Sequence, residues 1–269
     1  PLVRALWDTG SFGFVAVARL EWEKFAAGSP AAVYEEYQRV KDERHTRLHL
    51  DHVPVIDEDG RRVDYRRIIG AALGLGFSSV MVDGSRLPLA ENVAATRAVV
   101  EMSHAAGVPV EGELGAVLGH ESGPLPPYEE LFASGRGFTD PSEARRFVVE
   151  SGVDWLSVAV GNIHGAISGA ARSACKPRAR LDIAHLDRIA AASGVPLVLH
   201  GGSGIPKALV LEAVRHGIAK INVGTSLRQA YEAVRNVSVA AAQEAVYGAA
   251  VALLRDELEL AGSARRINP

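Results

Sequence analysis

The chain has 269 residues, of which 48% are hydrophobic, and its 29 basic and 32 acidic side chains give a formal net charge of −3 at pH 7. This balance, without any dense Lys/Arg block, argues against nucleic acid or an acidic membrane as the main partner and favours a small-molecule substrate. No apolar stretch is long enough to cross a bilayer, and the single cysteine excludes an internal disulfide. We therefore expect a cytoplasmic protein with one domain over residues 1–269.

Apolar, β-rich runs alternate along the chain with segments of helical periodicity. The runs begin at Phe14, Arg47, Ser78, Val108, Trp155, Pro196 and Lys220. The helical segments 91–107, 140–152 and 205–217 each end in Gly, as many helices do. The alternation predicts an α/β fold with a parallel sheet, of the (β/α)8 TIM-barrel type. Because seven runs are one short of eight, we expect the first strand to be missing from this numbering and residues 1–10 to be the remains of the first helix.

Two segments depart from the alternation. Residues 115–140 are rich in Gly and Pro and follow the run that carries Glu113, so they predict a long loop over the rim of the barrel. Residues 239–259 are Ala-rich, with polar side chains on one side and apolar ones on the other, and predict a long amphipathic helix. Packing or subunit contact is the expected role of that helix.

Three histidines follow β-rich runs: His52, His164 and His200. A histidine at the carboxyl end of a strand brings an imidazole to one rim of the sheet, and three of them converge if the strands are parallel and nearly closed. Three neutral imidazoles there would form a Zn²⁺ site with one open position. A lone histidine of this kind is more often structural, but three at equivalent places favour a metal site.

Other polar residues lie at the same strand ends: Asp51, Asp83, Glu113, Asn162 and Asn222. Buried carboxylates need partners because desolvation is costly, and a divalent cation meets that need. Asp51 adjoins His52, so their side chains point to opposite faces unless the strand bends there. Capping of the next turn is an alternative role for Asp51.

A glycine-rich run follows the last of these histidines. Residues 200–204 read "HGGSG" and precede a predicted helix, so their backbone N–H groups form a nest that suits an anion, most often phosphate. Residues 220–226 read "KINVGTS" and offer similar groups. Phosphate sites in such barrels commonly form from the loops after strands seven and eight.

Several motifs together carry a family resemblance: "LHLDH", "GFSSVMVDGS", "ENVAATRAVV", "VEGELG", "VGNIHG", "VLHGGSG" and "KINVGTSL". Over residues 46–228 the chain resembles the class II, metal-dependent ketose-phosphate aldolases, which include fructose-bisphosphate and tagatose-bisphosphate aldolases. The resemblance implies reversible retro-aldol cleavage of a ketose 1-phosphate or ketose bisphosphate to dihydroxyacetone phosphate and an aldehyde. It also implies a homodimer or homotetramer.

The resemblance assigns roles to individual residues. Asp51 is the acid/base at the aldehyde oxygen, and Glu121 is a mobile-loop glutamate that moves the proton at the nucleophilic carbon. The implied residues around Zn²⁺ or another divalent transition metal are the ligands His52, His164 and His200, with Glu113 and Asp83 as acidic neighbours or ligands of a second cation. The implied substrate-phosphate contacts, near which relatives hold a monovalent cation, are Gly165, Gly201, Ser203, Asn222, Thr225 and Ser226.

The chain departs from the family pattern near two of these residues. His120 and Ser122 flank Glu121 in place of the usual neighbours, and Gly224 replaces an aspartate of one bisphosphate branch, which argues against fructose 1,6-bisphosphate. Lys220 is expected to open its strand, so no lysine is an obvious candidate for imine chemistry. Two alternatives remain open: a metal-dependent hydrolase on the same barrel, and an inactive sugar-phosphate binder.

Overall fold

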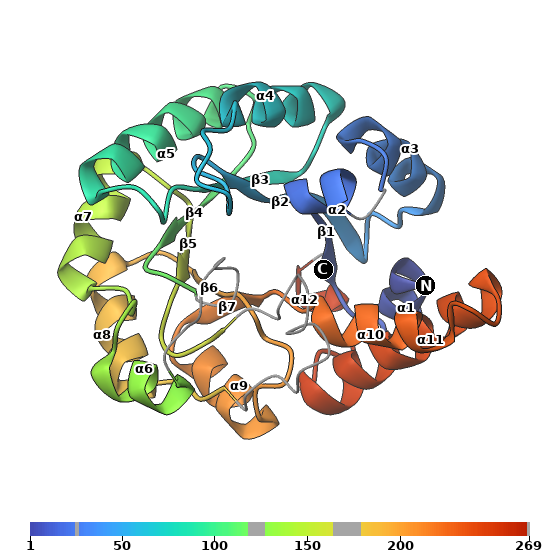
Figure 1. Ribbon diagram of the computed structural model, residues 1–269. Helices are drawn as coiled ribbons and strands as arrows, with labels where there is room; N and C mark the ends of the chain where they lie inside the picture. Colours follow the sequence, from blue (N-terminus) through green and yellow to red (C-terminus); the bar gives the residue numbers. More distant parts are fainter. Residues whose placement is uncertain (25–26, 118–126, 164–178, 268–269) are drawn as a thin grey trace.

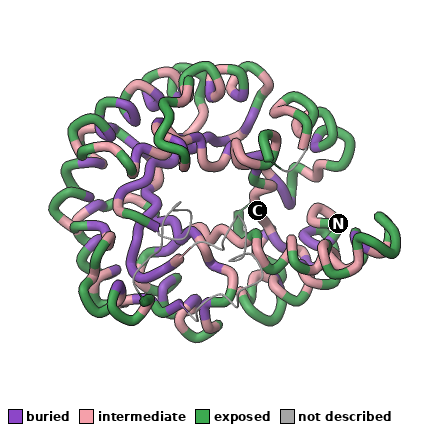
Figure 2. The backbone as a smooth tube through the Cα atoms, in the orientation of Figure 1, coloured by how far each residue is buried: buried purple, intermediate pink, exposed green. Residues whose placement is uncertain are grey.

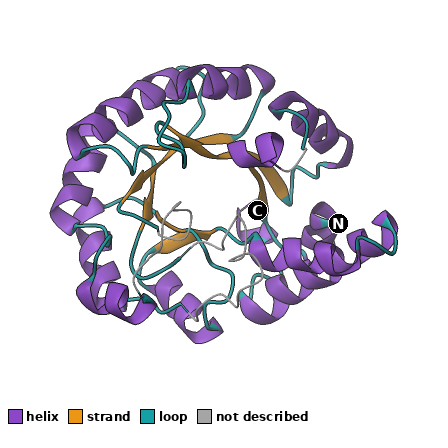
Figure 3. Cartoon of the chain, in the orientation of Figure 1, coloured by secondary structure: helices purple, strands orange, loops and turns teal. Residues whose placement is uncertain are grey.

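The centre of the protein is a curled parallel sheet. The computed structural model describes residues 1–24, 27–117, 127–163 and 179–267. The strands are β1 (Gly13–Ala18), β2 (Thr46–Pro54), β3 (Ser79–Asp83), β4 (Val110–Leu114), β5 (Trp155–Val158), β6 (Leu197–Leu199) and β7 (Ile218–Ile221). Each strand pairs in parallel with the next along the chain. The sheet curls into a ring with helices outside it (Figures 1 and 3), which confirms the predicted fold class.

Helices follow most of the strands. They are α1 (Leu2–Thr9), α2 (Arg19–Lys24), α3 (Pro30–Val40), α4 (Tyr65–Leu75), α5 (Leu89–His104), α6 (Tyr128–Ser134), α7 (Pro141–Ser151), α8 (Ile183–Ser193), α9 (Lys207–Arg215), α10 (Thr225–Val234), α11 (Val239–Ala252), the π-helical turn Leu253–Glu257 and α12 (Ala264–Ile267). Among the described residues, no helix combines the length and the apolar character that crossing a bilayer would require.

Helix ends follow local sequence chemistry, as α7 illustrates. The Asp140 carboxylate accepts hydrogen bonds from the backbone N–H groups of Ser142 and Glu143. Pro141 begins the helix, and Gly152 ends it in the left-handed conformation at φ 73°. These features made this helix predictable from sequence.

The two edges of the sheet are β1 and β7. Within the part of the chain that the structure describes, no strand lies between them. Helix α1, the predicted remnant of a first helix, packs against α11 and the π-helical turn after it through a small cluster of Ala5, Leu6, Ala250 and Leu254. Helices α1 and α11 thus lie side by side near the opening of the ring (Figure 1).

Two predicted segments differ in detail from the structure. The predicted loop over residues 115–140 contains helix α6, which Pro127 precedes and Gly135 ends at φ 62°. A proline before a helix and a glycine after it are common helix boundaries, and both were present here. The many other Gly and Pro residues of this segment led to the prediction of a loop. The predicted helix over 239–259 is present as α11 and a π-helical turn that ends at Glu257.

Side chains alternate across each strand between the helices and the interior of the ring. On β4, a Cβ atom at Gly112 would lie 3.0 Å from the Phe147 ring of α7, so glycine allows close packing of helix on sheet. Glu111 and Glu113, on the opposite face of β4, are both buried. Figure 2 shows that buried residues gather along the strands and that exposed residues lie on the outer helices. The interior of the ring is therefore where the polar site forms.

Candidate active site

The end of β2 brings two adjacent side chains to one site. The pairing register between β2 and β3 shifts between Leu50 and Val53, and His52 has φ 34°, a left-handed conformation that costs a non-glycine residue roughly 1–3 kcal/mol. In a regular strand, Asp51 and His52 would point to opposite faces. The irregularity instead lets ligand atoms of both side chains lie within 4.8 Å of those of His200, at the carboxyl rim of the sheet.

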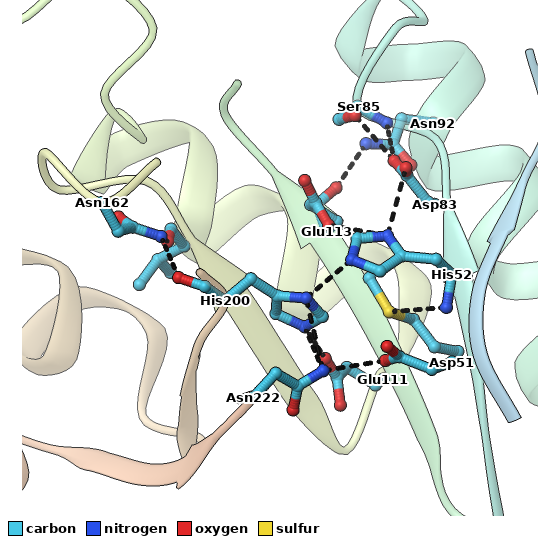
Figure 4. Close-up of polar contacts among 12 residues, drawn as sticks. Asp51, His52, Asp83, Ser85, Asn92, Glu111, Glu113, Asn162, His200 and Asn222 are labelled. Atoms are coloured by element: carbon cyan, nitrogen blue, oxygen red, sulfur yellow. Dashed lines mark hydrogen bonds and ion pairs between the residues drawn. The ribbon is translucent and has the colours of Figure 1, made fainter. Parts of the chain in front are cut away.

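His52 and His200 face one another across the ring (Figure 4). Nε2 of His52 lies 2.7 Å from Nδ1 of His200, and the ring planes are 80° apart. His200 is buried, whereas His52 is partly exposed. Together with Asp51 they form a group whose potential ligand atoms all lie within 4.8 Å of one another. Two of the three predicted histidine ligands therefore come together as expected.

Three predicted site residues lie outside the described residues: His164, Glu121 and Gly165. Their assignments remain predictions.

A second group of acidic residues lies on the other side of His52. Nδ1 of His52 is 3.7 Å from Asp83 Oδ2 and 3.8 Å from Glu113 Oε2. Ser85 donates two hydrogen bonds to Asp83. Glu113 Oε2 is buried and accepts no hydrogen bond from any described residue. A buried carboxylate oxygen in this condition is typical of a position that a cation occupies.

The charges at this site favour a bound cation. Burial alone would lower the pKa of His52, but Asp51, with Asp83 and Glu113, raises it to about 10. Burial and the nearby Asp83 carboxylate raise the pKa of Glu113 well above its ordinary value. Carboxylates thus lie close enough together here that, without a cation, Glu113 favours its neutral form. Two imidazoles and several carboxylates form a donor set that fits Zn²⁺ or a similar divalent ion.

Three polar residues at the site were missed from sequence: the buried His49 and Glu111, and Lys220, whose side chain is 11% exposed. Each lies two positions before a predicted site residue: Asp51 on β2, Glu113 on β4, and Asn222 directly after β7. Side chains two apart on a strand share a face, so this period-2 spacing was the signal that could have found them. The prediction that Lys220 begins its strand is wrong, because Lys220 lies within β7, which begins at Ile218.

Asn222 and Asn162 support the site from neighbouring strand ends. The Asn222 side-chain amide donates a hydrogen bond of 2.9 Å to Asp51 Oδ1 (Figure 4). The Asn162 amide donates to the backbone oxygen of His200 at 3.0 Å, and its own oxygen accepts from the Val160 N–H at 2.9 Å. Asn222, predicted as a phosphate contact, thus contacts the predicted acid/base in this structure.

The loops after β6 and β7 meet at the predicted phosphate site. The Ser226 backbone N–H donates to the Ser203 hydroxyl at 3.4 Å. Thr225 begins α10, whose preceding residue, Gly224, makes no side-chain cap, and the first turn of a helix suits an anion. Gly201 has φ 67°, a conformation that favours glycine. The predicted phosphate-binding residues in the described chain are therefore close together.

Gly202 controls how closely these two loops approach. A Cβ atom there would lie 2.6 Å from Ile221 Cγ2 and 3.1 Å from the Asn222 backbone oxygen. We expect Gly202→Ala to lower the free energy of unfolding by about 1–3 kcal/mol through overpacking, measured by urea denaturation. Gly248→Ala in α11, where a Cβ would meet nothing within 4 Å, is the control. It should raise the free energy of unfolding by about 0.5–1 kcal/mol. Equal stability of Gly202→Ala and the parent would contradict the packing argument.

Sequence comparisons identify relatives of this chain. Residues 2–264 match the family model described as fructose-bisphosphate aldolase class-II. A fructose-bisphosphate aldolase of Staphylococcus aureus is 38% identical over 191 residues, which is 71% of this chain and 58% of the relative. A fructose-bisphosphate aldolase of Streptococcus pyogenes is 41% identical over 158 residues, 58% of this chain and 48% of the relative. The chain thus matches only about half the length of these relatives.

Structural comparisons agree with the sequence comparisons. The YdjI aldolase from Escherichia coli K12 superposes with a TM-score of 0.71 at 28% identity, covering 98% of this chain and 87% of that one. A putative fructose-1,6-biphosphate aldolase from Coccidioides immitis gives a TM-score of 0.74 at 26% identity, covering 98% and 88%. With the curled parallel sheet and the match over residues 2–264, these findings show that the chain belongs to the class II fructose-bisphosphate aldolase family.

Proposed function

We propose that the protein is a zinc-dependent class II aldolase, which reversibly cleaves a ketose 1-phosphate or ketose bisphosphate to dihydroxyacetone phosphate and an aldehyde. The observation that carries the proposal is the convergence of Asp51, His52 and His200 at one rim of the ring, beside two loops suited to phosphate. A metal-binding group and an anion-binding group on one rim suit a phosphorylated, oxygen-rich substrate.

His52 and His200, with His164 by family resemblance, are the proposed ligands of the divalent ion. When bound, such an ion acts as a Lewis acid that stabilises negative charge developing on substrate oxygen atoms. Asp51 is the proposed acid/base: it removes the proton from the substrate hydroxyl during cleavage and returns it during condensation. Its hydrogen bond from Asn222 orients the carboxylate. Glu121 is the proposed proton carrier at the nucleophilic carbon.

The phosphate group is the proposed anchor of the substrate. Gly201, Ser203, Thr225 and Ser226 would hold it through backbone N–H and hydroxyl groups. Anchoring one end of a ketose at a fixed distance from the metal site orients the bond to be cleaved.

The inward-facing Lys220 does not favour imine chemistry. Its ammonium donates a hydrogen bond of 2.7 Å to Glu111 Oε2. An ion-paired ammonium has no lone pair with which to attack a ketone, whereas an imine-forming lysine must be deprotonated. This contact supports metal-dependent cleavage over a Schiff-base route.

A panel of ketose phosphates tests the proposal. We expect the protein to release dihydroxyacetone phosphate from at least one ketose 1-phosphate or bisphosphate, detected with a coupled dehydrogenase. The matched unphosphorylated ketoses should be cleaved with a much lower kcat/KM. Binding of panel members without turnover would indicate a sugar-phosphate binder instead. Hydrolysis of a panel member without carbon–carbon cleavage would indicate a hydrolase.

A further inference from the structure

A chain of contacts runs from Lys220 to the rim through the interior of the ring. The Lys220 ammonium donates to Glu111 Oε2 at 2.7 Å, and the other carboxylate oxygen, Oε1, accepts from His200 Nε2–H at 2.7 Å. A carboxylate can only accept, so the proton of this contact belongs to His200 Nε2. The second ring nitrogen of His200, Nδ1, therefore carries a lone pair. This lone pair is directed at Nε2 of His52, which lies 2.7 Å away.

Lys220 also lies within a group that has the donor types of a second metal site. Ligand atoms of His49, Asp51 and Glu111 all lie within 4.8 Å of one another. The Lys220 ammonium is 3.3 Å from His49 Nε2, and Nδ1 of His49 is hydrogen-bonded to Ser79 at 2.8 Å. The ammonium therefore supplies positive charge beside this group of possible ligand atoms.

Burial makes this contact chain sensitive to loss of the ammonium. The side chain of Glu111 is 0% exposed and that of Lys220 is 11% exposed. Without the Lys220 ammonium, Glu111 would be a buried carboxylate with no cationic partner on its Oε2 side, and Asp51 and Glu113 lie nearby. Its hydrogen bond to His200 depends on the carboxylate staying in place between the two side chains.

We propose that Lys220 is a positioning residue, which acts through Glu111 to keep the proton of His200 on Nε2 and the lone pair of Nδ1 directed at the metal site. A carboxylate that accepts the outer N–H of a metal-binding histidine fixes the ring orientation and strengthens the ligand, and its loss typically costs about 10–100-fold in metal affinity. This inference rests on the metal-binding part of the proposed function and not on the identity of the substrate.

The test is Zn²⁺ affinity of the metal-free protein, measured by competition with a chromophoric chelator. Lys220→Met keeps an unbranched side chain, one atom shorter, and removes the charge. We expect its dissociation constant for Zn²⁺ to rise about 10–100-fold. We also expect the ¹⁵N resonances of the His200 ring, in the metal-free protein, to show the Nε2–H tautomer in the parent and a mixture in the variant.

The matched control is Lys207→Met. Lys207 on α9 also forms an ion pair, with Glu259 at 2.6 Å, but on the surface of the protein. Its Zn²⁺ affinity should stay within about twofold of the parent, since surface ion pairs contribute little. An equal loss of affinity in this control would overturn the inference.

A second variant covers the case in which Lys220→Met does not fold. The double variant Glu111→Gln/Lys220→Met leaves no unpaired buried charge, and its neutral amide is a weaker acceptor for His200. It should show the same loss of affinity and of tautomer preference. Parental Zn²⁺ affinity together with the parental His200 tautomer, in either variant, would overturn the proposal. Neither the Zn²⁺ affinity nor the His200 tautomer depends on turnover. A protein that cleaves no ketose phosphate of the panel can therefore still support or contradict this inference.

Discussion

Replacing Asp51 with Ala should lower kcat for retro-aldol cleavage by about 10²–10⁴-fold, the usual contribution of a general acid/base, while the protein still binds its divalent ion. Burial alone would disfavour the carboxylate, but the charge of His52 and the hydrogen bond with His49 hold the pKa of Asp51 well below its usual value. The group is therefore ionised near neutral pH and ready to accept a proton. Steady-state kinetics and metal content, measured on the same preparation, check this prediction.

Asp51→Asn separates proton transfer from positioning. An amide at this position can still accept the hydrogen bond that Asn222 donates at 2.9 Å, but it cannot carry the proton. Its kcat should be as low as that of Asp51→Ala, with little change in KM. A variant that loses the metal along with turnover would show instead that Asp51 acts as a ligand, since its carboxylate belongs to the same group as His52 and His200.

Removing the divalent ion should lower turnover by about 10³-fold or more, because Lewis-acid stabilisation of developing negative charge supplies several kcal/mol. The predicted site carries several carboxylates, and the nearby Asp51, Asp83 and Glu113 raise the pKa of His52 to about 10. Chelator treatment followed by addition of Zn²⁺ or Co²⁺ should abolish and then restore release of dihydroxyacetone phosphate.

Borohydride provides the control for a covalent route. Treatment with substrate should leave most of the activity intact, because Lys220, the inward lysine described on β7, is ion-paired with Glu111. Irreversible inactivation that requires substrate, with a reduced adduct on a lysine, would replace the metal mechanism with an imine.

Much of the fold could be predicted from the sequence because its signals are local. Alternation of apolar β-rich runs with helical periodicity predicts parallel strands, and the strands lie where those runs are, although β7 begins two residues before the predicted start. His52 and His200 could be assigned to one rim because carboxyl ends of parallel strands share an edge of the sheet.

The contacts inside the ring could not be predicted in the same way. Asp51 and His52 share a site through a backbone irregularity at φ 34°, which no local pattern indicated. The Lys220–Glu111 contact joins residues 109 positions apart in the chain. Lysine is rarely buried, so its place within β7 runs against ordinary preference and depends on a carboxylate that another strand provides. Residue order and periodicity are local properties of the chain, whereas the pairing of buried charges depends on which strands the curled sheet brings face to face.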